Sequence, residues 1–305
     1  MGEGGAEVDD VRAGTVTANG VEFGYLEAGP DGGPLALCLH GFPDSARTWR
    51  HLLPELADAG YHAVAPFMRG YAPTAVPDDG AYQTGALVAD AVALHEAFGG
   101  GSDAVLVGHD WGAFATYGAV AHAPERWRRA VTLAVPPMAS MMSSFFQYEQ
   151  LKRSFYIFLF QTPLAEAAVN GAFVAGLWRD WSPGYDATDD VAHVMDCLAE
   201  PANLAAALGY YRAMFDPSRH VDRYAAQQEA VSAPAGRPLL YLHGADDGCL
   251  GADAFAPGGD VSAVLAHLPP GSRAELVPGT GHFLHLERPA EVNRLILDWL
   301  AAAQG

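Results

Sequence analysis

The stretch "VLVGHDWGAF" at residues 105–114 decides the fold, because it reads as a buried strand that turns sharply into a helix. Residues 104–107 are apolar and largely β-branched, while residues 113–122 form an Ala-rich, helix-compatible run. Between them, "GHDWG" has the G-x-S-x-G spacing, in which two small residues let the chain turn tightly enough to expose one strained side chain. The exposed residue here is Asp110, so the turn presents a carboxylate in place of a serine hydroxyl.

Strand-like and helix-like runs alternate on both sides of this turn. A hairpin is predicted over residues 16–28, because Asn19-Gly20 between alternating apolar residues is a strong turn signal. Further strands are predicted at residues 35–41, 61–68, 103–110, 130–137, 238–244 and 274–279, and helices at 45–59 and 84–98. The pattern predicts an α/β fold with a mostly parallel eight-stranded sheet, helices on both faces, and ligands beyond the carboxyl ends of the strands.

One long segment interrupts this alternation. From residue 138 to about 229 the chain has no strand-like β-branched run and is rich in Ala, Phe, Tyr and Met. We expect several helices here, inserted as a cap after the sixth strand, with most of the aromatic side chains serving core packing. The predicted organisation is a core domain in two parts, residues 1–137 and 230–305, with a helical cap at 138–229.

Composition limits the possible partners and the cellular compartment. The chain has 17 Lys and Arg against 36 Asp and Glu, a net charge of −19, which disfavours nucleic acid and anionic membrane surfaces. Residues 1–14 lack the basic and apolar regions of an export signal, and no apolar run reaches the length of a membrane span. Three scattered cysteines form no C-x-x-C pair, so we expect no disulfide framework, no thiolate metal site and a cytoplasmic location. Abundant Ala and a strong bias of Arg over Lys indicate a bacterial source.

An aspartate at the elbow needs a base and an acid to serve as a nucleophile. A carboxylate that attacks saturated carbon forms an ester, which an activated water must then hydrolyse. In chain order, an acid after the seventh strand and a histidine after the eighth are expected, and Asp247 and His282 occupy these places. Asp247 is preferred over Asp246 for its spacing from the preceding glycine, and His285 is expected to be structural.

Hydrolysis of that ester passes through an oxyanion, which requires two hydrogen-bond donors. The backbone N–H of Trp111, directly after the elbow residue, is one candidate. The second is the N–H of Phe42 in "HGFP" after the third strand, where Gly41 permits close approach and Pro43 shapes the turn, with a cis Phe42-Pro43 bond as one option.

Taken together, "HGFPDS", "GHDWGA", "HGADDGCL" and "GTGHFLHLERP" resemble the α/β-hydrolase-fold epoxide hydrolases of the soluble type, from about residue 16 to 299. The resemblance implies two cap tyrosines that hydrogen-bond the epoxide oxygen. "SFYIFLFQTPLAEA" at 154–167 is similar to the first tyrosine motif and places Tyr156 at its tyrosine. "LGYYRAMF" at 208–215 is similar to the second and places Tyr211 there, with Tyr210 as the alternative.

Haloalkane and fluoroacetate dehalogenases also use an elbow Asp, so dehalogenation is an alternative. Many haloalkane dehalogenases have Asn where Phe42 stands, and fluoroacetate dehalogenases have Arg where Trp111 stands. Phe42 offers no side-chain N–H for halide, and Trp111 favours an apolar substrate. Two rivals from other classes are a serine-type esterase, disfavoured by Asp110, and a non-catalytic small-molecule receptor.

The sequence therefore predicts an epoxide hydrolase that opens an oxirane to a vicinal diol through an ester on Asp110, with no metal or organic cofactor. The expected partners are a small apolar or aromatic epoxide and water, and the expected state is a monomer or homodimer. The residues assigned to the site are, as catalytic groups, Asp110, His282, Asp247, Tyr156 and Tyr211, as oxyanion donors, Phe42 and Trp111, and as substrate-binding groups, Phe42, Pro43, Trp111 and Phe283.

Overall fold

The computed structural model describes residues 11–302 of the chain. Residues 1–10, which carry most of the stretch assessed for an export signal, and residues 303–305 lie outside the described part. The strands are β1 (Arg12–Ala18), β2 (Val21–Ala28), β3 (Leu35–Leu39), β4 (His62–Pro66), β5 (Ala104–His109), β6 (Trp127–Leu133), β7 (Leu239–Gly244) and β8 (Arg273–Val277). The helices are α1 (Leu52–Asp58), α2 (Thr84–Ala97), α3 (Trp111–His122), α4 (Met138–Ser144), α5 (Tyr148–Arg153), α6 (Phe155–Leu159), α7 (Ala165–Ala168), α8 (Gly171–Trp181), α9 (Thr188–Cys197), α10 (Pro201–Phe215), α11 (Ala225–Ala230), α12 (Ser262–Leu265), α13 (Leu284–Glu287) and α14 (Pro289–Ala301).

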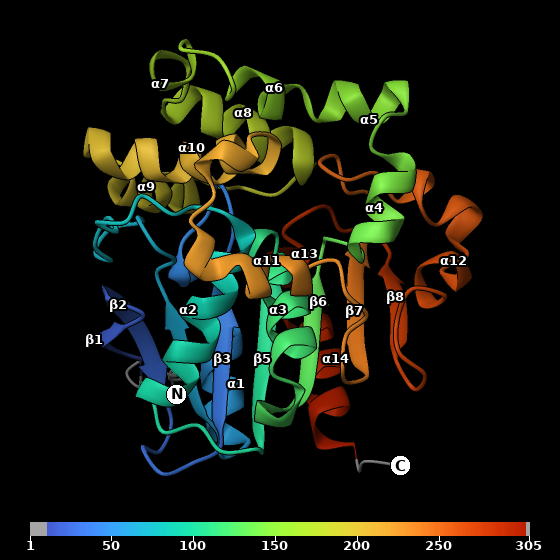
Figure 1. Ribbon diagram of the computed structural model, residues 1–305. Helices are drawn as coiled ribbons and strands as arrows, with labels where there is room; N and C mark the ends of the chain where they lie inside the picture. The colour runs from blue at the N-terminus through green and yellow to red at the C-terminus, as the bar shows by residue number, and fades with distance from the viewer. Residues whose placement is uncertain (1–10, 303–305) are drawn as a thin grey trace, which may run out of the picture.

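The eight strands form one sheet in the order β1-β2-β4-β3-β5-β6-β7-β8. The pairs β1–β2 and β2–β4 are antiparallel, and the other five pairs are parallel. Helices α2, α3 and α11 cover one face, and α1 and α14 lie behind the other (Figure 1). With both faces covered, β3, β5 and β7 are buried along their whole length, which explains their continuous apolar sequences. The predicted sheet is confirmed.

The first two strands form the expected hairpin. Asn19 and Gly20 have φ values of 47° and 74°, both in the left-handed region that a tight two-residue turn requires. The sequence therefore correctly located the turn and the antiparallel edge of the sheet.

The start of β6 differs from the prediction by three residues, since the strand begins at Trp127 and not at residue 130. Two charged residues, Arg128 and Arg129, masked this part of the strand in the sequence pattern. Both guanidinium groups have partners at the edge of the core: that of Arg128 donates to the Leu300 carbonyl, and that of Arg129 lies over the Trp299 ring. Arginine at these positions is therefore compatible with a half-buried strand.

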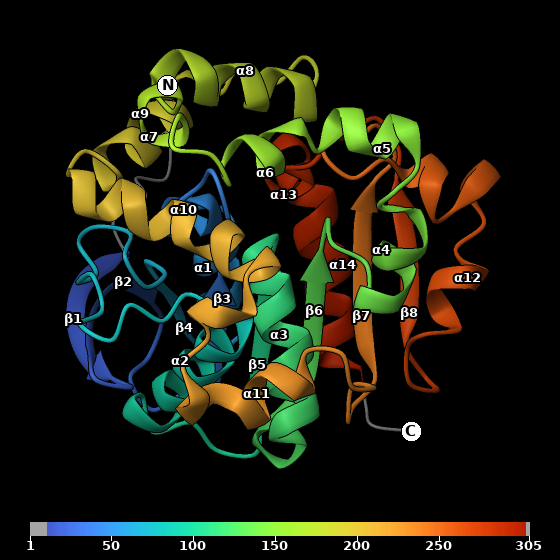
Figure 2. The ribbon, with the colours of Figure 1, turned by 45° about the horizontal axis from the view of Figure 1, so that its top comes forward.

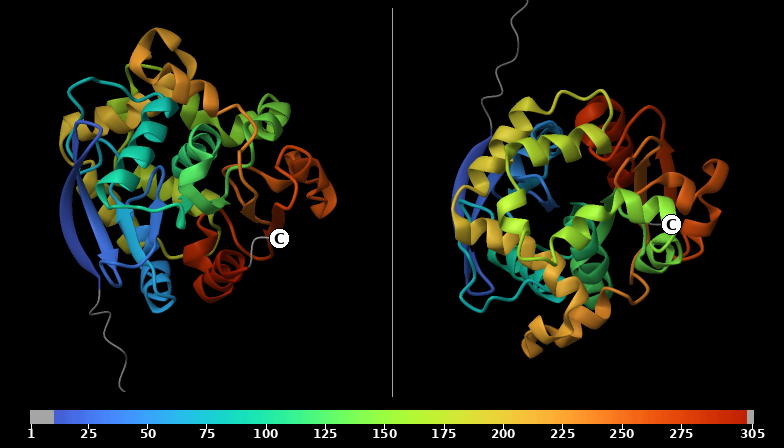
Figure 3. Two further views of the ribbon diagram at one scale, coloured as in Figure 1. Left: turned by 60° about the horizontal axis from the view of Figure 1, so that its bottom comes forward. Right: turned by 90° about the horizontal axis from the view of Figure 1, so that it is seen from above.

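Between β6 and β7 the chain forms only helices, α4 to α11 and short 3₁₀ turns. Helices α5 to α10 lie beyond the carboxyl ends of the strands in Figure 1, and the view from above shows them over that edge (Figure 3). Polar contacts join this segment to the core: Arg50 pairs with Asp190 at 2.7 Å, and the Trp178 indole donates to the Pro43 carbonyl at 2.9 Å. Across residues 11–302, no helix has both the length and the apolar character needed to cross a bilayer.

Figure 2 shows which ends of the core elements lie under the inserted helices. The arrowheads of β6 and β7 and the start of α3 face the helices inserted between the two strands. Side chains at the ends of β5 and β8 meet here although they are about 170 residues apart in sequence, as for Asp110 and His282. The inserted helices bring further side chains to the same place, such as Tyr156 and Tyr211. Parallel strands place their carboxyl ends at one edge, where α/β proteins bind ligands.

Candidate active site

Asp110 stands directly before α3 in a strained backbone conformation. Its φ is 53°, which non-glycine residues adopt only when the surrounding structure imposes it. The two small residues of the motif are sterically required: a Cβ on Gly108 would lie 2.2 Å from the Gly112 carbonyl oxygen, and a Cβ on Gly112 would lie 2.1 Å from the Leu39 oxygen. The elbow predicted from "GHDWG" is thus present, and it holds a buried carboxylate.

The backbone N–H of Phe42 donates a hydrogen bond of 2.7 Å to Asp110 Oδ1. A Cβ on Gly41 would lie 2.1 Å from that same oxygen, so glycine is needed for the loop after β3 to approach the elbow. The Phe42-Pro43 bond is cis, which was the option raised from the sequence. Trp111, whose N–H is the second predicted donor, begins α3 directly beside the carboxylate.

The predicted acid and base meet on the other side of Asp110. His282 Nδ1 lies 2.9 Å from Asp247 Oδ2, and His282 Nε2 lies 3.7 Å from Asp110 Oδ2. Asp247 Oδ1 accepts from the N–H groups of Cys249 and Leu250, so this carboxylate is held on two sides. The arrangement leaves Asp110 Oδ2 and His282 Nε2 facing each other without a direct hydrogen bond.

The two rival residues lie elsewhere. Asp246 is exposed, and its backbone N–H donates to the Thr280 carbonyl in the turn after β7. His285 is buried and bonded through Nε2 to Thr48 Oγ1 at 2.6 Å, and its ring stacks on Trp49. The geometry therefore favours Asp247 over Asp246, and it places His285 in a packing position.

The electrostatics of the site follow from burial and charge pairing. Burial by itself would raise the pKa of Asp110, but His282 and the Phe42 N–H outweigh it, so the pKa is lowered and the group is ionised. Burial would likewise lower the pKa of His282, but the charges of Asp247 and Asp110 raise it to about 10. At neutral pH the site therefore holds two carboxylates with one imidazolium between them.

Tyr156 from α6 and Tyr211 from α10 line a small cavity of about 30 Å³ together with Asp110. Their rings meet edge to face at 5.7 Å. The Tyr156 hydroxyl lies 3.5 Å from Cys249 Sγ, while the buried Tyr211 hydroxyl has no partner of hydrogen-bond geometry in the described residues. Burial raises the pKa of both phenols well above the ordinary value, and the Asp110 charge raises it further, so both are protonated.

Tyr210, the alternative to Tyr211, points away from this cavity. Its hydroxyl donates to the Arg69 carbonyl at 2.8 Å, and its ring packs against Tyr82 and Tyr71. One residue along a helix rotates a side chain by about 100°, which separates the two neighbouring tyrosines. Tyr211, and not Tyr210, lines the cavity at Asp110.

Three residues assigned to substrate binding do not line this cavity. The Phe42 ring is packed between Phe160 and Tyr211, and Phe283 is stacked face to face on Trp178. Pro43 lies in the same layer, where its carbonyl accepts from the Trp178 indole. These three residues pack against other side chains outside the cavity, whereas Trp111 does line it.

The sequence reasoning missed most of the lining. The cavity wall also contains Phe114, Val135, Met141, Phe145, Ile157, Met214, Cys249 and Leu250. Six of these belong to residues 138–229 or to the loop after β7, where the motifs marked only Tyr156, Tyr211 and Asp247 as part of a site. Only their apolar character was visible in the sequence.

Within residues 11–302, two buried clusters have the residue types of a metal site. Their members are Asp247, Cys249 and His282, and Asp44, His109 and His285, with ligand atoms within 4.8 Å of one another in each cluster. In the first cluster the His282–Asp247 hydrogen bond already occupies the facing atoms. In the second, His109 bonds the His282 carbonyl through Nε2 at 2.9 Å, so this cluster supports the loop that carries His282.

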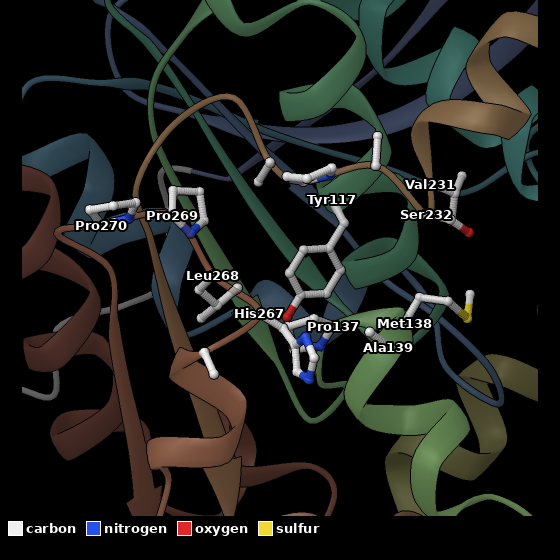
Figure 4. A pocket seen from close by; sticks show the side chains of 14 residues that line it. Tyr117, Pro137, Met138, Ala139, Val231, Ser232, His267, Leu268, Pro269 and Pro270 are labelled. Carbon is white, nitrogen blue, oxygen red and sulfur yellow. The ribbon is translucent and has the colours of Figure 1, made fainter.

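A wider pocket of about 460 Å³ lies away from the elbow (Figure 4). The Tyr117 ring projects among residues 137–139, 231–235 and 266–270, and its hydroxyl donates to the Val135 carbonyl. None of Asp110, Asp247 or His282 lines this pocket. Asp110, Tyr156 and Tyr211 line the smaller cavity and not this wider pocket.

The elbow, the strand order and the placement of acid and base define the class of protein. The chain belongs to the alpha/beta hydrolase fold family, whose model matches residues 34–289.

Within this family, the chain is similar to epoxide hydrolases. The chain is 33% identical to epoxide hydrolase A of Mycobacterium tuberculosis, over 95% of this chain and 97% of that protein. It is 30% identical to epoxide hydrolase 3 of Mus musculus, over 93% of this chain and 75% of that protein. Among solved structures, epoxide hydrolase A of Mycobacterium thermoresistibile superimposes with a TM-score of 0.75 at 26% identity, over 96% of this chain and 99% of that chain. An epoxide hydrolase from an endophytic Streptomyces superimposes equally well, at 0.75 and 29% identity, over 96% of each chain.

Proposed function

We propose that this protein hydrolyses epoxides to vicinal diols through a covalent ester on Asp110. One observation carries the proposal: a buried, ionised carboxylate shares one cavity with two protonated phenols, and a paired imidazole lies behind it. Such a cavity offers a nucleophile on one side of an oxirane and proton donors on the other. The similarity to epoxide hydrolases over nearly the whole chain supports the same reaction.

In the first step, Asp110 Oδ2 attacks an oxirane carbon and the carbon–oxygen bond of the ring breaks. Oδ2 is the free oxygen, since Oδ1 is held by the Phe42 N–H. Tyr156 or Tyr211 gives its proton to the departing oxygen and becomes a phenolate, while the other tyrosine stabilises the charge by a hydrogen bond. The products of this step are a hydroxyalkyl ester and one phenolate.

Ester formation removes the negative charge of Asp110, so His282 loses one of the two carboxylates that held its proton. The imidazolium then gives this proton up, which restores the phenol and leaves His282 neutral. Neutral His282, oriented by Asp247, is the form that takes a proton from water.

In the second step, this water attacks the carboxyl carbon of the ester. Oδ1 becomes the oxyanion, and the Phe42 N–H that already binds it stabilises the charge together with the Trp111 N–H. The bond between the carboxyl carbon and Oδ2 then breaks, so Oδ2 leaves as an oxygen of the diol and takes the proton of the new carboxyl group. His282 is again protonated and Asp110 again ionised, so the cycle closes.

Three features disfavour the rival reactions. A dehalogenase has no need for two buried phenols opposite the nucleophile. A serine-type esterase requires a hydroxyl where Asp110 stands, and a receptor has no use for the bonded pair of His282 and Asp247. We propose further that residues 138–229 act as a cap that brings both tyrosines to the elbow.

The cellular setting remains part of the proposal. Cys38, Cys197 and Cys249 are free and buried, which suits the reducing cytoplasm of a bacterial cell. We propose a monomer or homodimer acting on an epoxide and water without a cofactor.

A single turnover in water enriched in ¹⁸O tests the proposal. With excess enzyme and styrene oxide as substrate, the diol is expected to carry unlabelled oxygen from Asp110, and the elbow peptide is expected to gain one ¹⁸O by mass spectrometry. In the His282→Gln variant, the same peptide is expected to retain the mass of the whole epoxide as an ester. Labelled diol with an unlabelled elbow peptide would rule out the covalent route.

A further inference from the structure

An apolar groove of about 370 Å³ adjoins the cavity at Asp110. It is formed by α4, the end of α10, the starts of α2 and α3, and α11. Five side chains line both the groove and the cavity: Trp111, Phe114, Met141, Phe145 and Met214. The two spaces are therefore neighbours that share one wall.

The shared wall contains flexible side chains. The cavity, about 30 Å³, holds little more than a water molecule, so an oxirane with any substituent needs additional space. Two of the shared residues, Met141 and Met214, are unbranched and flexible, and methionine adapts its shape to what it packs against. A change of rotamer at these positions would remove part of the wall between the cavity and the groove.

The mouth of the groove is apolar and reaches the surface. Met142, Phe146 and Phe215 line it and are 48%, 66% and 43% exposed. Phe158, also exposed, stacks on Phe215 at 6.0 Å, and Phe145 contacts both Phe146 and Phe215. Exposed aromatic side chains grouped in this way mark a surface that binds apolar material.

Part of the groove outside the cavity is lined by polar residues, and none of them is Lys or Arg. Thr84, His220 and Gln228 line the groove but not the cavity. Gln228 Oε1 accepts from the Gly85 N–H, which leaves its NH₂ to donate, and His220 Nε2 donates to the Ala213 carbonyl, which leaves Nδ1 to accept. This pair suits an uncharged group that both donates and accepts, such as a hydroxyl or an amide.

We propose that the substrate is a lipophilic epoxide with one long apolar arm, which lies in this groove and ends in an uncharged group beside Gln228 and His220. This inference rests on the proposed function and specifies its substrate class. No Lys or Arg lines the groove, and the chain has a net charge of −19, so an arm that ends in a carboxylate is disfavoured.

Arm length is tested with 1,2-epoxypropane, 1,2-epoxyhexane and 1,2-epoxydecane. Each buried methylene contributes about 0.8 kcal/mol, or roughly a fourfold change, so kcat/KM is expected to rise at least about tenfold along the series. The Phe215→Asp variant, with a charge at the mouth, is expected to lose this preference. Leu164→Asp is the matched control, because Leu164 is 65% exposed and outside the groove, and it should retain the preference. A flat series, or equal loss in both variants, overturns the inference.

The end group is tested with 9,10-epoxydecan-1-ol and 9,10-epoxydecanoate at pH 7.5. The alcohol is expected to be the better substrate by at least about tenfold, because a carboxylate would be buried without a partner. Gln228→Lys places a cation at the end of the groove and is expected to shift the preference toward the carboxylate. Gln147→Lys, on an exposed residue outside the groove, adds the same charge and should leave the preference unchanged. Preference for the carboxylate in the unmodified protein overturns this part.

Binding separates failure of the inference from failure of the proposed function. Decane-1,2-diol and propane-1,2-diol are titrated by calorimetry, which requires no turnover. If no epoxide is hydrolysed, the proposed function is wrong, whereas the groove still predicts tighter binding of the longer diol. If epoxides are hydrolysed but both diols bind equally, only the groove inference is wrong.

Discussion

Replacing Asp110 with Asn tests whether the elbow carboxylate holds the proton on His282. The Nε2 atom of His282 lies 3.7 Å from Asp110 Oδ2. Two unit charges at that distance interact by about 4 to 5 kcal/mol at an effective dielectric constant near 20. Because ~1.4 kcal/mol is a factor of ten in proton affinity, removing the charge weakens proton binding at His282 roughly a thousandfold.

The pKa of His282 is about 10 in the unmodified protein. At about pH 8.5 the imidazole is therefore expected to be protonated in that protein and neutral in Asp110→Asn. Since the proposed ester at position 110 also removes the charge, the variant reproduces the electrostatic state in which His282 acts as a base in the proposed reaction. Asparagine keeps the size of the side chain, so the elbow and the cavity are preserved.

The measurement is an NMR titration of the protein carrying ¹³Cε1-labelled histidine. The chain has 12 histidines, so the His282 signal is assigned from the spectrum of His282→Gln. Asp246→Asn is the matched control, since Asp246 is an exposed carboxylate next to Asp247 and its loss should leave the titration unchanged. If His282 titrates alike in Asp110→Asn and the unmodified protein, the charge on Asp110 does not control the base and the proposed sequence of steps is wrong.

Three further predictions concern the tyrosines, the loop after β3 and pH. Tyr156→Phe and Tyr211→Phe each remove one proton donor, so each is expected to lower kcat/KM for styrene oxide at least about tenfold and the pair at least about a thousandfold; a double variant with unchanged kcat/KM would exclude both from catalysis. Gly41→Ala places a Cβ 2.1 Å from Asp110 Oδ1, so loss of activity and a lower Tm are expected, and normal values for both would contradict the close approach. The pKa of His282 is about 10 when folded against about 6.5 unfolded, so its stabilising effect is complete below about pH 6.5 and is lost as the pH rises through 10. Urea midpoints should therefore fall more steeply from pH 6.5 to 10 in the unmodified protein than in His282→Gln, and parallel curves would show that His282 carries no such linkage.

The core of the site could be predicted because its signals are local. The elbow needs small residues at positions 108 and 112, because a Cβ at either position would collide with neighbouring main chain. The chain can then turn sharply through Asp110, whose φ is positive. His282 lies in the loop five residues after the end of β8, as a strand-end pattern indicates. In such cases the constraint comes from residues next to one another in sequence, so the sequence contains it.

Which of two adjacent candidate residues faces the site depends on tertiary packing. Asp246 and Asp247 occupy the same turn, and only the folded chain shows that Asp247 points inward to His282 while Asp246 stays exposed. Tyr210 and Tyr211 occupy the same helix, and the way α10 packs on the core sends the first toward Arg69 and the second toward Asp110. A helical pattern predicts the helix but not its rotation about its own axis.

By itself, the sequence determined the order of strands and helices, the elbow with its carboxylate and the positions of the acid and base, because hydrophobic periodicity and turn sterics act over a few residues. The tertiary structure alone decided which cap side chains reach Asp110, which assigned aromatics withdraw into the core, and that Met141 and Met214 separate the cavity from the apolar groove. These features join residues more than a hundred positions apart in some pairs. Their proximity depends on how whole elements pack, and no short stretch of sequence specifies that.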